Sequence, residues 1–114
     1  MSKAWQAYAA HILDAIAKIE RIQQRGDLTR DDVLYDATLR NLQTLSEATQ
    51  RLPDAVKTAW PDIPWRQISG FRNILVHNYL GDIDAHTVQD VVRKRLPPLK
   101  AAVSGMLERA GTPR

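Results

Sequence analysis

Three residues that lie close together in the sequence could jointly do chemistry on a phosphate: Arg72, Asn73 and His77. A guanidinium binds phosphate oxygens through a planar fork of N–H donors. An imidazole can accept or release a proton near neutral pH. No acidic residue occurs between Arg66 and Leu80, so the stretch is suited to binding an anion.

The same stretch has the periodicity of a helix that begins near Pro64 and continues to about Leu80. At about 100° per residue, one face gathers large apolar side chains and should be buried: Ile68, Phe71, Ile74 and Leu75. A second face gathers Arg66, Gly70, Asn73 and His77, while Arg72 and Tyr79 share the other flank of the core. A mid-helix glycine costs roughly 1 kcal/mol relative to alanine. Gly70 therefore indicates a place where another backbone approaches closely.

The remaining elements that must position this helix are also predicted to be helical. Apolar spacings of three and four residues predict one helix over about 3–24 and a second that opens at a capping box of Thr29 and Asp32 and ends near Pro53. Prolines limit the segment 53–64 to at most a short helical turn. A further helix should be capped by Asp84 and should break or kink at Pro97-Pro98, before a last stripe over 99–107. We predict an all-α, four- to five-helix up-and-down bundle, a single domain over residues 1–110 with a frayed tail at 111–114.

Composition excludes several classes of protein. The 114 residues include no cysteine, which removes disulfides and thiolate metal sites, and no apolar run approaches the roughly 20 residues of a membrane span. The three histidines show no metal-ligand spacing, and His11 and His86 lack a comparable neighbour, so we expect no metal and no cofactor. Beyond Val92, six basic residues face only one acid, Glu108. Such a basic end either attracts a polyanion or is a solvated helix end. We expect a cytoplasmic protein, because no signal peptide is recognisable.

Arg72, His77 and Tyr79 match the R-x4-H-x-Y motif of HEPN domains. The surrounding segments resemble those of the HepT-like toxin family: 11–16 with Lys18-Ile19, 40–42, 46–48, 51–53, 63–66, 72–73 and 96–97. The resemblance covers about 8–103, nearly the whole chain. It implies a bundle of the HEPN type that pairs as a homodimer, or in a larger assembly, with both motif copies lining one cleft. Because Arg72 and Tyr79 lie about a third of a turn from Asn73 and His77, the stretch fits half of a site that a partner subunit completes.

The resemblance further implies a metal-independent endoribonuclease that acts as the toxin of a type VII-like toxin–antitoxin system. Arg72 and His77 would be catalytic, using the ribose 2′-OH of RNA as the nucleophile. Asn73, Arg66 and Tyr79 would bind or orient the RNA. The antitoxin would be a minimal, MntA-like nucleotidyltransferase that inactivates the toxin by AMPylation of Tyr79, placing charge and bulk in a basic cleft.

Two other hypotheses remain open. A single motif histidine per subunit, with no obvious second proton donor, also fits a non-catalytic helical partner that serves only as the AMPylation substrate of the nucleotidyltransferase. A purely structural dimeric bundle is the third hypothesis. It is the least favoured, because packing alone does not require Arg72, Asn73 and His77 together.

Overall fold

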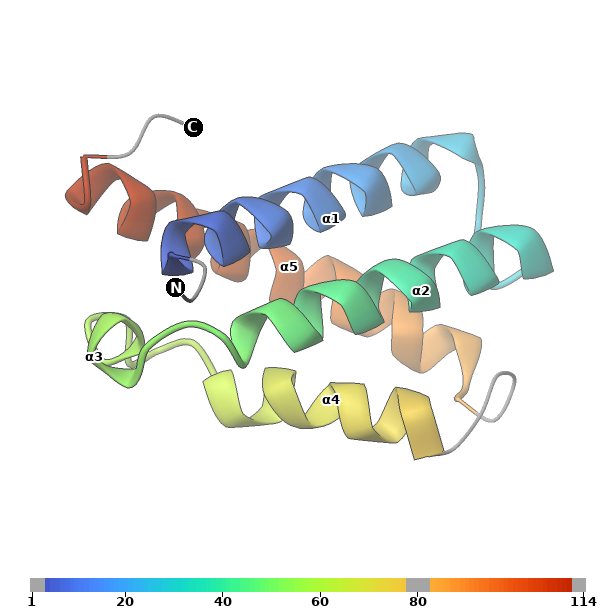
Figure 1. The fold of residues 1–114 in the computed structure, drawn as a ribbon. Helices are drawn as coiled ribbons and strands as arrows, with labels where there is room; N and C mark the ends of the chain where they lie inside the picture. The colour runs from blue at the N-terminus through green and yellow to red at the C-terminus, as the bar shows by residue number, and fades with distance from the viewer. Residues whose placement is uncertain (1–3, 78–82, 112–114) are drawn as a thin grey trace.

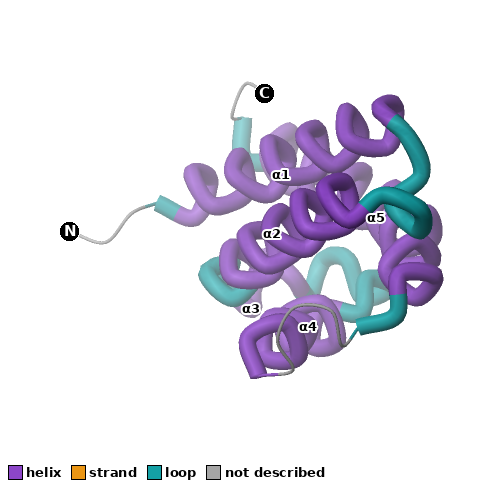
Figure 2. Tube along the Cα trace, turned by 90° about the vertical axis from the view of Figure 1, so that its right-hand side faces the viewer, coloured by secondary structure: helices purple, strands orange, loops and turns teal. Residues whose placement is uncertain are grey.

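Every regular element of the computed structural model is a helix over the described residues, 4–77 and 83–111, with side chains described at all of these positions except 72–77. The helices are α1 (Trp5–Arg25), α2 (Asp32–Thr49), α3 (Asp54–Lys57), α4 (Trp65–His77) and α5 (Ala85–Arg109). The four long helices alternate in direction along the molecule (Figure 1), and only helices and loops occur in the described part (Figure 2). The predicted all-α up-and-down bundle is confirmed, and α3 is the short turn expected between the prolines. Part of the predicted frayed tail, 112–114, lies outside the described residues.

The helices pack around α1 and α2, which lie side by side for most of their length. Helix α4 lies against α2, and α5 lies against α1. The core is formed by apolar side chains that are at most 3% exposed, among them Ile12, Ile16, Ile19, Leu39, Leu42, Leu45, Val88, Val92, Leu99 and Val103. Most of these come from α1, α2 and α5, and in α4 the described apolar residues Ile68 and Phe71 are half-buried. Helix α4 is thus an outer helix, held mainly by one neighbour.

Helix α1 ends at Gly26, as its sequence indicates. Gly26 has a φ of 158°, and a Cβ atom placed there would lie 3.1 Å from the Leu34 side chain. Both the backbone conformation and the close approach of α2 therefore favour glycine. The turn that follows brings α2 back along α1.

The N-cap of α2 differs from the predicted one. The Asp31 carboxylate accepts hydrogen bonds from the backbone N–H groups of Val33 and Leu34. Thr29 instead donates its backbone N–H and its hydroxyl to Asp27, at 2.9 and 2.7 Å, and these two bonds lower the pKa of that carboxyl. The predicted capping box of Thr29 and Asp32 is therefore wrong, because the neighbouring Asp31 has the better-placed carboxylate. At α5, the predicted cap is confirmed: Asp84 accepts from the backbone of Thr87.

Helix α5 continues through Pro97 and Pro98, so of the two predicted alternatives, a break or a kink, the break does not occur. The two prolines lack the N–H groups that would bond the carbonyls of Arg93 and Lys94. Both prolines and both of those residues are exposed, so water can satisfy the freed carbonyls. The neighbours Leu96 and Leu99 are 5% and 1% exposed. Their burial in the core outweighs the local cost of the prolines.

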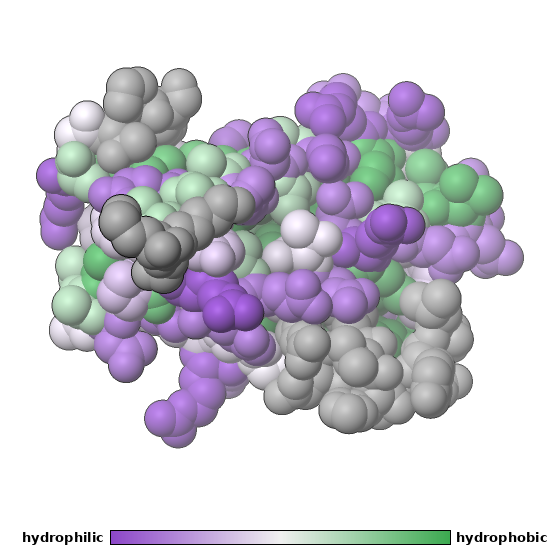
Figure 3. All heavy atoms as spheres, in the orientation of Figure 1, coloured by the Kyte–Doolittle hydropathy of each residue, from purple (hydrophilic) through white to green (hydrophobic). Residues whose placement is uncertain are grey.

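No described helix is both long and apolar enough to cross a membrane. In the view of Figure 3, hydrophilic side chains cover most of the described surface, with apolar side chains showing between them.

Candidate functional site

The start of α4 is fixed by hydrogen bonds to the loop before it. The backbone N–H of Trp65 donates to the Ile63 carbonyl at 2.8 Å, and that of Ile68 donates to Pro64 at 3.0 Å. The indole N–H of Trp65 donates to the Trp60 carbonyl at 3.0 Å. Pro64 has no N–H to lose at this position, so it suits a helix start. The first turn of α4 is therefore held to the segment 58–64.

A polar tie joins α4 to α2 just before the motif. The hydroxyl of Thr49, a fully buried residue, donates to the Ser46 carbonyl at 2.7 Å. Its single proton is thereby used, so the Ser69 hydroxyl donates to Thr49 across 3.1 Å. The Gln50 side-chain amide donates to the Ser69 carbonyl at 3.1 Å. These bonds set the register of α4 against α2 one turn before Arg72.

The motif residues Arg72, Asn73 and His77 all lie in the second half of α4, so the predicted helix is confirmed as far as His77. Arg72 and His77 are five residues apart, about 7.5 Å along the helix axis. The side chains of these three residues are not among those described, so the half-site that a partner subunit would complete stays a prediction. Tyr79 lies outside the described residues.

Arg66 is exposed in the first turn of α4 and borders a groove. The groove has a volume of about 660 Å³ and is lined by residues from the end of α2, from α3 and from α4: Gln50, Asp54, Lys57, Thr58, Pro61, Trp65, Arg66 and Ser69. The structure thus places Lys57 and Trp65 beside Arg66, which the sequence analysis had already named as a candidate RNA-binding residue.

Gly70 leaves open space on α4. A Cβ atom at this position would meet no atom within 4 Å outside its own stretch of helix. Packing within the described chain therefore does not require a glycine here. The room that the predicted approach of a partner helix needs is present.

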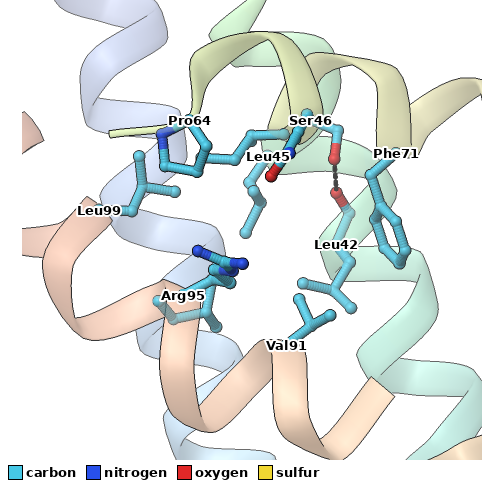
Figure 4. Close-up of a pocket in the computed structure, with 11 residues that line it drawn as sticks. Leu42, Leu45, Ser46, Pro64, Phe71, Val91, Arg95 and Leu99 are labelled. Carbon is cyan, nitrogen blue, oxygen red and sulfur yellow. Dashed lines mark hydrogen bonds between the residues drawn. The ribbon is translucent and has the colours of Figure 1, made fainter. Parts of the chain in front are cut away.

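An apolar pocket separates α4 from α5 (Figure 4). It measures about 220 Å³ and is lined mainly by apolar side chains of α2, α4 and α5, including Leu42, Leu45, Ile68, Phe71, Val91, Leu96 and Leu99. Arg95 is its one charged lining residue, and Figure 4 shows its guanidinium directed toward the middle of the ring of side chains. The predicted core residues Ile68 and Phe71 do face the core, but the seam they form with α5 is loosely filled.

The other histidines lie on different helices from the motif. His11, on α1, is exposed and meets the ring of Tyr8 edge-on, with 6.4 Å between ring centroids. His86 is exposed in the first turn of α5. Over the described residues, no three metal-ligating side chains come together in a way that could hold a metal ion.

Comparison with known proteins gives one family. The profile of the family described as "Ribonuclease HepT-like" matches residues 12–106. No solved structure matches the chain significantly.

Several curated proteins are similar to this chain. A "Putative RNase" of Caldanaerobacter subterraneus subsp. tengcongensis is 30% identical over 110 residues, which are 94% of this chain and 97% of that protein. The "Probable ribonuclease HepT" of Thermococcus cleftensis is 30% identical over 105 residues, 88% of this chain and 93% of that protein. A "Gamma-glutamylcyclotransferase and putative RNase" of Methanocaldococcus jannaschii is 33% identical over 113 residues, 95% of this chain. The chain spans half the length of this last relative.

Proposed function

The chain belongs to the HepT-like ribonuclease family, and on that premise we propose that it is an endoribonuclease that cleaves RNA without a metal ion, as the toxin of a type VII-like toxin–antitoxin pair. The match over residues 12–106 carries the proposal. Two relatives that this chain covers almost completely bear ribonuclease names. The motif residues Arg72 and His77 lie on one helix. The proposed place of action is the cytoplasm, where the RNA substrate is made.

The proposed reaction is an attack of the ribose on its own phosphate. The 2′-OH oxygen bonds to phosphorus while the bond from phosphorus to the 5′-oxygen breaks, leaving a 2′,3′-cyclic phosphate and a 5′-hydroxyl. His77 accepts the 2′-OH proton or protonates the departing 5′-oxygen. Arg72 stabilises the negative charge that develops on the phosphoryl oxygens. Asn73 and Arg66 orient the RNA.

The site is proposed to be completed in a homodimer. One subunit offers one motif histidine, whereas the reaction needs both a base and an acid. A two-fold axis near the open surface at Gly70 would bring the second His77 to the same phosphate. Each histidine could then take one of the two proton-transfer roles.

Tyr79 is proposed as the position where the toxin is switched off, and it also contributes to RNA binding. The phenolic oxygen would attack the α-phosphorus of ATP on the nucleotidyltransferase antitoxin, with pyrophosphate as the leaving group. The added adenylate carries negative charge and bulk, so it competes with RNA for the same cations. This step rests on the family resemblance and on the presence of Tyr79 two residues after His77.

RNA cleavage in the presence of EDTA tests the enzyme activity. The wild-type protein should cleave RNA with the chelator present, and both His77→Ala and Arg72→Ala should reduce the rate at least about 100-fold, since each removes a group acting in the transition state. His86→Ala is the matched control, because His86 is an exposed helical histidine outside the motif. Full activity in either motif variant would refute the catalytic assignment.

Intact mass of the protein, expressed with and without a small nucleotidyltransferase encoded next to it, tests the switch. We expect added AMP mass on the wild-type protein and none on Tyr79→Phe. Adenylation of a protein that never cleaves RNA, even unmodified, would favour the non-catalytic partner over the ribonuclease.

A further inference from the structure

The groove at the start of α4 combines an aromatic surface with two cations. Its walls are the end of α2, the short helix α3 and the first turn of α4. Lys57 and Arg66 supply positive charge, and Asp54 is the one acid among the lining residues. The groove therefore carries a net positive charge around an aromatic ring.

Trp65 offers a fixed aromatic surface in this groove. It is half-buried, and its indole N–H bond to Trp60 orients the ring. Trp60 is itself held against α5, with the Arg109 guanidinium 4.5 Å from its ring centroid. A base that stacked on Trp65 would meet a ring that is already ordered, so little conformational entropy would be lost on binding.

The two cations are available to a ligand. Lys57 is half-buried and Arg66 is exposed, and neither forms an ion pair with a described residue. The Gln50 side-chain amide also lines the groove and keeps a second N–H for a ligand, whereas the Thr58 hydroxyl already donates its proton to the Asp54 carbonyl. A phosphate bridging Lys57 and Arg66 would thus be held by charge, with the Gln50 amide as a further donor.

The groove is aligned with the motif along one helix. Arg66 precedes Arg72 by about 9 Å and His77 by about 16 Å along the axis of α4. By helical periodicity, positions 66, 70, 73 and 77 share one face. A single strand with its reacting phosphate at the motif would therefore pass over the groove a few nucleotides away.

We propose that this groove is a second RNA subsite, in which Lys57 and Arg66 hold a backbone phosphate and Trp65 stacks a base a few nucleotides from the cleaved bond. The subsite rests on the proposed ribonuclease function and specifies its substrate as a single-stranded segment several nucleotides long. Stacking on an indole tolerates any base, so the subsite reads strand length and single-strandedness rather than sequence. Asp54 disfavours a phosphate on its side of the groove and so limits the positions the backbone can take.

Binding of labelled single-stranded RNA tests the subsite separately from cleavage. All variants are made in a His77→Ala background and titrated by fluorescence anisotropy with an oligoribonucleotide of about 12 nucleotides and with a trinucleotide. Lys57→Ala and Arg66→Ala should each weaken binding of the long RNA about tenfold and lower the slope of log Kd against log salt by about one unit. The loss should be smaller for the trinucleotide, which cannot reach both the motif and the groove.

Two matched substitutions test the aromatic surface. Trp65→Phe keeps a stacking ring and Trp65→Leu does not, while both lose the bond to Trp60. Trp65→Leu should bind the long RNA about tenfold more weakly than Trp65→Phe. Circular dichroism of both variants checks that the overall helix content is unchanged. Asp54→Asn should tighten binding a few-fold, because it removes the one acid from the groove.

Lys18→Ala serves as the charge control, since Lys18 is an exposed lysine on α1 that does not line the groove. If Lys57→Ala and Arg66→Ala match Lys18→Ala, the subsite is refuted even when the wild-type protein cleaves RNA. If the groove variants lose RNA binding but the wild-type protein cleaves nothing, the proposed function fails, and the groove is an RNA-binding surface rather than the subsite of a ribonuclease. A labelled poly-glutamate that binds as tightly as RNA, with the same dependence on Lys57, would make the groove a surface for acidic protein and overturn the proposal.

Discussion

Gly105 on α5 illustrates how one residue far along the chain positions the start of α4. A Cβ atom at this position would lie 2.9 Å from the Trp60 ring, so the indole occupies space that only a glycine leaves. Trp60 in turn presents the carbonyl that receives the Trp65 indole N–H. The glycine at position 105 therefore makes room for Trp60, and Trp60 in turn orients the Trp65 ring, the proposed stacking surface.

Gly105→Ala should destabilise the protein although alanine is the better helix former. Helix propensity alone would favour alanine by about 1 kcal/mol, whereas overpacking against a ring typically costs about 1–3 kcal/mol. We expect a net loss of about 1 kcal/mol in the free energy of unfolding, measured by urea denaturation. In a Trp60→Leu background the clash is gone, so the same substitution should become neutral or stabilising. An equal loss in both backgrounds would contradict the packing argument.

The motif shows what sequence can predict about single residues. Arg72, Asn73 and His77 are recognisable because residue type and spacing along one helix carry the signal. Lys57 carries no such signal, since it lies nine residues before Arg66 across a segment broken by Pro61 and Pro64. Only the path of the chain between α3 and α4 brings the two cations to one groove.

At the level of elements, the sequence predicted the helices well where local and tertiary preferences agree. Helix α1 ends at its glycine, α5 begins at Asp84, and the proline-rich segment forms only the turn of α3. Where local and tertiary preferences compete, the prediction left a break and a kink as alternatives. Pro97 and Pro98 argue locally for a break, but burial of Leu96 and Leu99 against the core keeps α5 continuous. Whether burial outweighs the cost of the prolines depends on contacts with other helices, and the local sequence pattern does not contain this information.

The pocket between α4 and α5 leaves this seam loosely packed, so filling it should stabilise the protein. Val91 is half-buried at the pocket wall, and Val91→Ile adds one methylene to a space of about 220 Å³. Cavity filling of this kind commonly gains about 0.5–1 kcal/mol, seen as a higher urea midpoint. Val103→Ile is the matched control, because Val103 is fully buried and the added methylene has no free space. It should destabilise by about 1 kcal/mol. A loss of stability in Val91→Ile as well would show that the seam has no usable room.

At the level of the whole molecule, the bundle keeps α4, the helix that carries the motif, on the outside. Helix α4 lies against α2, and its described apolar side chains are only half-buried. An outer helix with an open glycine and a cationic groove at one end has surface available for a strand of RNA and for a second subunit. The fold could be predicted from apolar periodicity, but the proposed pairing of two copies would depend on a surface that periodicity does not describe.

Gly70→Leu tests that pairing. Because a Cβ atom at this position would meet no atom within 4 Å outside its own stretch of helix, we expect leucine to leave the fold of the single subunit intact. It would block the close approach of a partner helix, so we expect the dimer dissociation constant to rise at least about tenfold, equivalent to about 1.4 kcal/mol. Sedimentation velocity over a range of protein concentrations measures this change.

The catalytic consequence separates a composite site from one that is complete in each subunit. If both copies of His77 are needed at one phosphate, RNA cleavage by Gly70→Leu should fall in proportion to the lost dimer and recover at high protein concentration. Ala10→Leu, the same kind of change at an exposed position of α1, should alter neither association nor cleavage. Gly70→Leu that is fully monomeric yet fully active would place the whole reaction within a single subunit. The side chains of Arg72 and His77 in one subunit would then have to reach the same phosphate, although the two residues are about 7.5 Å apart along the helix axis.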